Sequence, residues 1–193
     1  MREAQMTAVQ MPNVGWATNA DHGDGCAIHP HNKRFVGTRL GNSALAIIYN
    51  QSVSWRSPTY ASSTASPPPV AAAAAAGAAP RASAVTATIT LDNVVGELEL
   101  RPPSNAVAFP VQNCTEQDKT VPGTCAWAAI ELGSGGGWVN ATVGVKGNTI
   151  VLTAPGNGAA VNTAYGWGAI PMMTVYEKET GLPVLPWNTS WKV

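Results

Sequence analysis

The hydrophobic period of this chain changes along its length, and that change limits the fold more than any other feature. Residues 85–91 alternate between apolar side chains and threonines, which is the pattern of a β-strand with one buried face. Further strand candidates lie between turn residues at 94–100, 106–111, 126–132, 138–145, 149–153 and 161–167. Several short strands separated by turns predict a β-sandwich-like domain over residues 84–193.

The first part of the chain follows a helical period instead. Residues 2–10 contain neither Gly nor Pro and predict a short helix, and residues 14–18 form a short apolar run that fits a buried strand. After Pro30, apolar side chains recur at three- and four-residue steps and predict a helix with one apolar face: Val36, Leu40, Ala44, Ile47 and Ile48. Helix, strand, loop and helix in this order are typical of the closing unit of an α/β sheet, which we assign to residues 1–57.

Residues 58–83 separate these two units and have a biased composition. They contain Pro67-Pro68-Pro69, a run of alanines over 71–76 and many serines. Such a segment is interpreted as a low-complexity linker or insertion. We assign no function to it.

Charge and hydropathy exclude several classes of protein. Lys+Arg and Asp+Glu number 11 each among 193 residues, so no basic surface indicates a nucleic-acid partner. No apolar run is long enough to indicate a membrane span. Charged residues make up only 11% of the chain, which favours β-structure and loops over exposed amphipathic helices.

Cysteines and asparagine motifs favour an oxidising compartment. Cys114 and Cys125 are close in sequence and could close a small disulfide loop, which would leave Cys26 as an odd thiol. Candidate N-glycosylation motifs occur at Asn50, Asn113, Asn140 and Asn188. We therefore expect a secreted, lysosomal or otherwise extracytoplasmic protein. Because the first residues hold no apolar signal core, its signal peptide would lie upstream of Met1.

Reactive side chains are concentrated in residues 21–33. His29 precedes Pro30, which fits the first turn of a helix, so His29 lies where the chain leaves a loop. A carboxylate on one ring nitrogen of His29 would let the other nitrogen act as a base toward a hydroxyl nucleophile. Asp24 is a candidate for that carboxylate, whereas Cys26 stands at the spacing at which one large class of esterases carries its Asp.

Other interpretations of these residues remain open. His29 could merely cap a helix, and Asp24-Gly25 could be an ordinary turn. A metal site is also conceivable, although the spacing matches no recognised ligand pattern; its ligands would be Asp21, His22, Asp24, Cys26 and His29.

The β-domain offers weaker candidates. Tryptophans could form a sugar-stacking face or could pack in the core and at strand edges; they are Trp127, Trp138, Trp167, Trp187 and Trp191. Glu177 and Glu179 would share one face of an extended strand, and we expect them at a solvated strand end.

Several motifs, in the same order along the chain, resemble those of the sialate O-acetylesterase family of SGNH-type serine esterases. The first group is Arg2-Glu3-Ala4-Gln5, Pro12-Asn13-Val14-Gly15, Asp21-His22-Gly23-Asp24, Ile28-His29-Pro30-His31-Asn32-Lys33, Val36-Gly37-Thr38-Arg39-Leu40 and Ala44-Leu45-Ala46. A looser group downstream is Tyr165-Gly166-Trp167, Val175-Tyr176, Gly181-Leu182-Pro183 and Pro186-Trp187.

The resemblance implies a fold and an activity. Residues 1–57 would be the C-terminal end of an SGNH-type α/β/α hydrolase domain, followed by the linker 58–83 and the β-sandwich-like domain 84–193. Such enzymes hydrolyse O-acetyl esters on sialic acid or related acetylated sugars by Ser-His-Asp acyl transfer, with no metal or organic cofactor. His29 matches the catalytic histidine and Asp24 its acidic partner, with Asp21 as the alternative.

The family's Gly-Asp-Ser nucleophile motif and its oxyanion residues do not occur in this sequence. A base without a nucleophile and an oxyanion hole has no acyl transfer to perform. We therefore expect the chain to be inactive alone and to work with a missing N-terminal hydrolase portion or a partner chain. The alternative is a non-catalytic carbohydrate-binding or structural β-module, or the remnant of a truncated gene.

Overall fold

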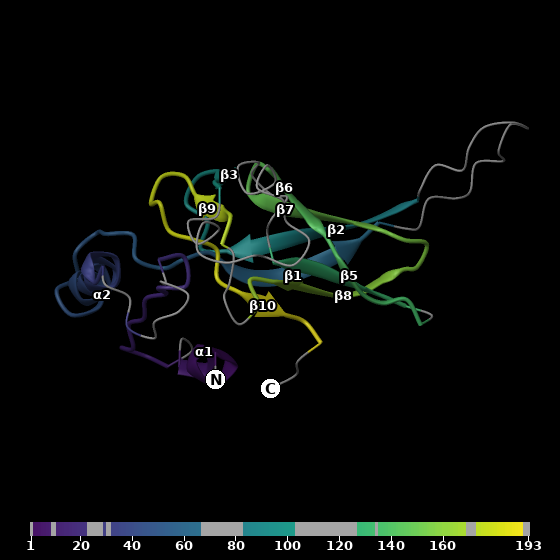
Figure 1. Ribbon diagram of the computed structural model, residues 1–193. Helices are drawn as coiled ribbons and strands as arrows, with labels where there is room; N and C mark the ends of the chain where they lie inside the picture. The colour runs from purple at the N-terminus through teal and green to yellow at the C-terminus, as the bar shows by residue number, and fades with distance from the viewer. Residues whose placement is uncertain are drawn as a thin grey trace, which may run out of the picture.

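A computed structural model describes residues 2–8, 11–22, 29, 32–66, 83–102, 127–133, 135–168 and 173–190. The helices are α1 (Arg2–Thr7) and α2 (Arg34–Ile47). The strands are β1 (Thr59–Ala65), β2 (Ala84–Asp92), β3 (Leu98–Leu100), β4 (Ala128–Leu132), β5 (Gly137–Asn140), β6 (Thr142–Lys146), β7 (Thr149–Pro155), β8 (Ala160–Tyr165), β9 (Val175–Glu177) and β10 (Trp187–Asn188). The prediction of a β-rich chain with few helices is confirmed (Figure 1).

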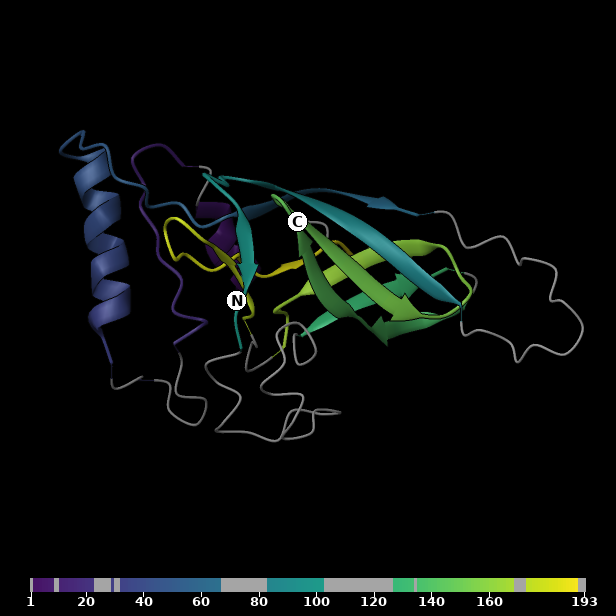
Figure 2. The same ribbon diagram turned by 90° about the horizontal axis from the view of Figure 1, so that it is seen from above.

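Two antiparallel sheets of four strands enclose the core. Their strand orders are β1-β2-β7-β6 and β10-β8-β4-β5, and a two-stranded sheet, β3-β9, lies beside them. Ile89, Ile150 and Leu152 of the first sheet and Ile130 of the second are fully buried members of one hydrophobic cluster. The two larger sheets therefore pack face to face as a sandwich (Figures 1 and 2).

The alternation of apolar residues and threonines in the sequence explains the burial pattern of the longest strand, β2. In β2 the side chains of Val85, Ala87, Ile89 and Leu91 are all buried, and the residues between them are more exposed. Three of these positions pair with apolar residues of β7: Val85 with Ala154, Ala87 with Leu152 and Ile89 with Ile150. Burying a side chain of this size stabilises the fold by about 1.5–3 kcal/mol, so the core-facing residues fix the register.

Residues 138–145, predicted as one strand, form two. β5 pairs with β4, whereas β6 pairs with β7 in the other sheet. The chain crosses between the sheets at Ala141, whose side chain is buried and whose N–H donates to the Ala128 carbonyl, 2.9 Å away. A tight turn at Lys146-Gly147-Asn148, with Gly147 at φ 59°, joins β6 to β7.

Two other differences from the sequence expectations concern strands. Residues 14–18 form no strand, because the described part of the chain gives them no neighbouring strand to pair with. Residues 59–65 fall in the segment expected as a linker, yet they form β1 and pair with β2 along an edge of the sheet. β1 is rich in Ser and Thr and mostly exposed, so it lacks the apolar alternation that marks a half-buried strand.

Helix α2 lies to one side of the sandwich, with β9 and its following turn between them (Figures 1 and 2). The predicted helix is present, but its buried residues are Arg39 and Ser43 rather than the apolar positions expected from the sequence. Residues 11–22 run against this buried side, and a Cβ on Gly15 would come within 2.6 Å of the Ser43 hydroxyl oxygen. Among the described residues, neither helix is long and apolar enough to cross a membrane.

Candidate functional site at the junction of α2 and β9

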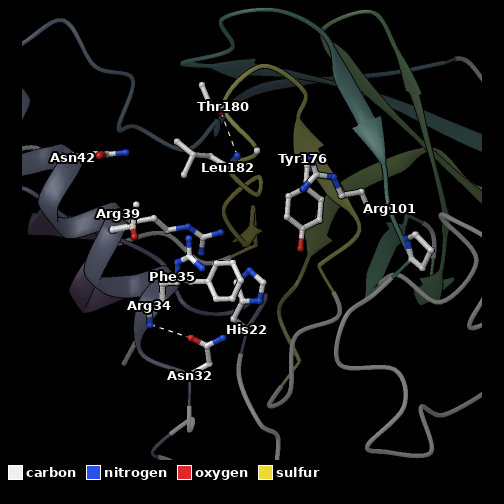
Figure 3. A pocket seen from close by; sticks show the side chains of 13 residues that line it. His22, Asn32, Arg34, Phe35, Arg39, Asn42, Arg101, Tyr176, Thr180 and Leu182 are labelled. Carbon is white, nitrogen blue, oxygen red and sulfur yellow. Dashed lines mark hydrogen bonds between the residues drawn. The ribbon is translucent and has the colours of Figure 1, made fainter.

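A pocket of about 650 Å³ lies where α2, β9 and the end of residues 11–22 meet (Figure 3). Its lining includes His22 and Asn32, which stand on either side of the segment that contains His29. Phe35 and Arg39 line it from α2, and Tyr176 lines it from β9. The pocket is therefore lined by residues of both the N-terminal unit and the β-domain.

A buried ion pair lies next to this pocket, and one of its partners, Arg39, lines the pocket. Arg39 Nη1 lies 2.7 Å from Asp21 Oδ1, and Arg39 Nη2 lies 2.7 Å from Asp21 Oδ2. Asp21 is 0% exposed and Arg39 is 8% exposed. Arg39 Nη1 also donates to the Thr18 carbonyl at 2.7 Å. A bidentate guanidinium–carboxylate pair of this kind fixes both partners in position as well as balancing their charges.

His22 lies beside this pair. Its ring stacks on Phe35 with the centroids 3.5 Å apart and an angle of 9° between the planes. Nε2 of the ring lies 3.3 Å from Asp21 Oδ2. Burial lowers the pKa of His22, and the Arg39 charge acts in the same direction, while Asp21 partly opposes them. The lowered pKa favours the neutral form of the ring, which packs on Phe35.

Tyr176 brings the β-domain to the same carboxylate. Its hydroxyl donates to Asp21 Oδ2 over 3.4 Å, and the Arg101 guanidinium lies 4.5 Å from the ring centre. Figure 3 shows the hydroxyl pointing toward the stacked rings of His22 and Phe35. Burial raises the pKa of Tyr176, and the nearby Asp21 charge raises it further, so the phenol remains a hydrogen-bond donor.

Strand β9 is itself held by a buried hydroxyl group. Tyr165 of β8 is 0% exposed, and its oxygen accepts hydrogen bonds from the backbone N–H groups of Thr174 and Val175, both at 2.9 Å. Burial raises the pKa of Tyr165. The position of Tyr176 thus depends on contacts that continue into the sandwich core.

The residues expected for catalysis are only partly described. His29 is exposed. Asp24 and Cys26 lie outside the described residues, so the proposed pairing of Asp24 with His29 stays a prediction. Asp21, the alternative acid, is the fully buried partner of Arg39. Among the described residues, no three His, Cys, Asp or Glu side chains gather in a way that could hold a metal ion.

The other sequence candidates can be placed in part. Asn50 and Asn140 are exposed and Asn188 is half-buried, while Asn113, Cys114 and Cys125 lie outside the described residues. Trp127 and Trp138 are exposed to 38% and 43%, whereas Trp187 is buried and stacks on Tyr165, with ring centres 5.0 Å apart. Glu177, expected at a solvated strand end, is buried instead.

Sequence reasoning did not assign Arg39 or Tyr176 to the site. Both fall within motifs that resemble the esterase family, but neither carries a local signal of its role. Arg39 follows Asp21 by 18 residues and Tyr176 by 155, so only the tertiary fold brings them together.

Comparison with known proteins gives a fold relationship. No model of a protein family and no curated protein matches this chain. Among solved structures, the chain is similar to a carbohydrate acetylesterase from Xanthomonas citri, with 23% sequence identity and a TM-score of 0.69. The similarity covers 98% of this chain and 36% of that chain, so this chain spans about a third of the length of that enzyme. At this level of identity, the likeness establishes the fold.

Proposed function

We propose that this chain is the C-terminal portion of a carbohydrate esterase that removes acetyl groups from O-acetylated sugars, with sialic acid or a related sugar as substrate. The observation that carries the proposal is the similarity of nearly the whole chain to one part of a carbohydrate acetylesterase. The ordered series of esterase-like motifs, including Ile28-His29-Pro30 and Val36–Leu40, supports it independently.

The outer side of α2 supports a partner that completes the hydrolase. Leu45 and Ile48 are exposed to 41% and 71%, and helical spacing places them on the side away from Arg39 and Ser43, while Leu40, exposed to 47%, lies on the flank between the two sides. In a complete domain, the apolar side of an amphipathic helix faces the core, whereas Leu45 and Ile48 face away from the buried side of α2. A covering layer of hydrolase domain, in the same polypeptide or in a second chain, would bury these side chains.

Two glycines on the outer side of α2 also support a covering partner. A Cβ on Gly37 or Gly41 would meet nothing within 4 Å. Glycine within a helix costs about 0.5–1 kcal/mol relative to alanine. The described residues give no reason for this cost, whereas close packing of another element against Gly37 and Gly41 would explain it.

In the complete enzyme, His29 would take the proton from a serine supplied by the rest of the hydrolase, and Asp24 would hold the imidazole ring. The serine oxygen would then attack the acetyl carbonyl, and the sugar hydroxyl would leave with the proton from His29. Water activated by His29 would release acetate in the second step. Export to an oxidising compartment belongs to the same proposal and fits the exposed Asn50 and Asn140.

The test uses the protein as its source organism produces it, with its full length and any bound chain. We call this protein the native form. The chain is tagged in place and purified, mass spectrometry determines its full length and any bound chain, and acetate release is measured with an O-acetylated sialic acid and an acetylated neutral sugar. We expect hydrolysis by the native form, loss of at least about 1,000-fold on His29→Ala, and no hydrolysis by residues 1–193 alone.

Two results would count against this function. Full activity of the His29→Ala variant would show that the histidine has no part in catalysis. Glycan binding by residues 1–193, without acetate release by any native form, would favour a carbohydrate-binding β-module instead. The exposed Trp127 and Trp138 would then be the first side chains to replace.

A further inference from the structure

Strand β5 carries an exposed tryptophan and an exposed asparagine on one face. Its side chains alternate, so Val139 packs against the core while Trp138 and Asn140 point outward. The pairing with β4 agrees with this, because Asn140 lies opposite Ala129, which is also on the outer face of the sheet. Trp138 and Asn140 are therefore neighbours on this face, with their Cα atoms about 7 Å apart.

The same asparagine begins a glycosylation acceptor motif. Asn140-Ala141-Thr142 has the pattern Asn-X-Thr, and Trp138 stands two positions before the asparagine. The other three acceptor motifs have an aliphatic residue or proline at that position: Ile48, Val111 and Pro186. Asn140 is therefore the one acceptor asparagine of the sequence that has an aromatic residue two positions earlier.

We propose that Asn140 carries an N-linked oligosaccharide whose first N-acetylglucosamine ring lies on the Trp138 indole. The new bond joins Asn140 Nδ2 to the anomeric carbon of the sugar. The bond from that carbon to a diphosphate oxygen of a lipid-linked oligosaccharide breaks, the lipid diphosphate leaves, and the amide proton passes to a base of the transferase. The inference rests on the export that belongs to the proposed function and is independent of the esterase activity.

The surroundings of Trp138 explain why this contact would stabilise the chain. Tryptophan is buried in most positions of folded proteins, yet 43% of Trp138 is exposed. A sugar ring presents apolar C–H groups on its faces, and these pack well on an aromatic ring. Ala129, opposite Asn140, has a small side chain and leaves room for the sugar. Among the described strands, β5 also ends the order of its sheet, so the outer sugars can extend past this edge.

A glycan at Asn140 leaves the candidate site open. The residues that line the pocket beside α2 belong, within the described part of the chain, to neither β4, β5 nor β8. Removing the acceptor motif by Thr142→Ala should therefore lower the stability of the chain without changing acetate release by the native form. A parallel loss of activity at unchanged stability would contradict the structural role of the glycan.

The first experiment determines whether Asn140 is occupied. Peptides of the native form are treated with a peptide N-glycosidase, which converts each glycosylated Asn to Asp, and mass spectrometry locates the converted residues. We expect conversion of Asn140 in most chains. Glycans at Asn50 or Asn188 with none at Asn140 would overturn the inference alone, whereas a native form without any glycan would overturn the export as well. Acetate release is measured on the same sample, so a failure of the esterase function is recognised separately.

The second experiment tests the contact between the sugar and the indole. Residues 1–193 are secreted from a eukaryotic host as the unmodified chain, Trp138→Ala, Thr142→Ala and the double variant. The same four chains from a bacterial cytosol lack the glycan and are the matched control. In the secreted set, the glycan should raise the folding equilibrium constant at least about threefold more with Trp138 than without it, as expected for one stacked aromatic contact. Equal coupling in both sets would overturn the contact.

A third measurement needs no substitution and remains usable if a variant fails to fold. An endoglycosidase trims the oligosaccharide of the unmodified secreted chain to its first N-acetylglucosamine, and NMR follows the acetamido and ring protons of that sugar. Because the indole ring current acts on protons above its face, we expect some of these signals to move upfield relative to the denatured chain. Signals that stay at their denatured positions would refute stacking on Trp138.

Discussion

At Glu177, burial and hydrogen bonding act on one carboxyl group in opposite directions. The residue is 1% exposed. Its carboxylate accepts hydrogen bonds from the backbone N–H groups of Thr180, Gly96 and Glu179, at 2.6, 3.0 and 3.2 Å. Burial raises the pKa of Glu177, but the bonds from Thr180, Glu179 and Gly96 favour the charged form and bring the pKa below its usual 4.5. The charged carboxylate therefore holds the turn after β9 to the segment before β3.

We predict that Glu177→Gln lowers the free energy of unfolding at pH 7 by about 1.5–3 kcal/mol, because hydrogen bonds to a charged acceptor are replaced by weaker ones. A depressed pKa stabilises the fold above the unfolded-state value near 4.5, and the effect disappears as the pH falls through the lower folded-state value. We therefore expect denaturation experiments to give a smaller difference in the free energy of unfolding between the variant and the unmodified chain at pH 3 than at pH 7.

Glu97→Gln is the matched control for this prediction. Glu97 is highly exposed, and its oxygen lies 3.9 Å from the Lys178 ammonium group. An exposed pair of this kind contributes little, so we expect a change below about 0.5 kcal/mol. An equal effect of both substitutions, or a gap that widens in acid, would contradict the role given to Glu177.

At the scale of single elements, α2 combines two features with opposite consequences. Its glycines weaken the helix in this chain, and its outer side offers the close-packing surface proposed for a hydrolase partner. We predict that Gly41→Ala raises the free energy of unfolding of residues 1–193 by about 0.5–1 kcal/mol, because a Cβ there meets nothing within 4 Å. In the native form, the same methyl group should weaken assembly and lower esterase activity.

Thr38→Ala gives the control for this helix. Thr38 lines the pocket beside β9, and alanine also improves helix propensity at this position. Because alanine is smaller than threonine, this substitution adds no atoms that could obstruct an element packed on Gly41, and it should raise stability in both forms of the protein. If Gly41→Ala also stabilises the native form and leaves its activity unchanged, no element packs closely on Gly41.

Prediction from the sequence succeeded for elements with strong local periodicity and failed where partners are distant. β2 is half-buried, so its alternation is visible in the sequence. β1 pairs with β2 but exposes most of its side chains, and composition alone assigned it to a linker. The helix at α2 was predicted, but its buried side was not, because Asp21 and Gly15 set that side through contacts with Arg39 and Ser43.

The same reasoning separates the parts of the candidate site. His29 was identified because several reactive residues are adjacent in the sequence and because Pro30 was expected to begin a helix, which starts at Arg34 in the structure. The environment of Asp21 could not be predicted, because Tyr176 reaches it from the far end of the chain. The local sequence also does not distinguish a buried Asp or Glu from an exposed one. Its function depends on whether a cation such as Arg39 lies beside it, which only the fold determines.

At the scale of the whole molecule, the core is concentrated in the sandwich, and α2 contributes little to it. The hydrophobic cluster contains buried residues of β2, β4, β6 and β7, whereas the buried residues of α2 are Arg39 and Ser43. Local opening requires less free energy where few apolar contacts must be broken. The two parts of this chain should therefore differ in stability.

We predict that amide hydrogen exchange in residues 1–193 is at least about 100-fold faster in α2 than in β2 and β7. The comparison with the native form makes the measurement informative. If a hydrolase layer covers Leu40, Leu45 and Ile48, exchange in α2 should slow to approach that of the sandwich, while β2 and β7 change little. Equal protection of α2 and β2 in residues 1–193 would mean that the helix needs no further partner, and the exposed apolar side of α2 would then no longer support a missing hydrolase layer.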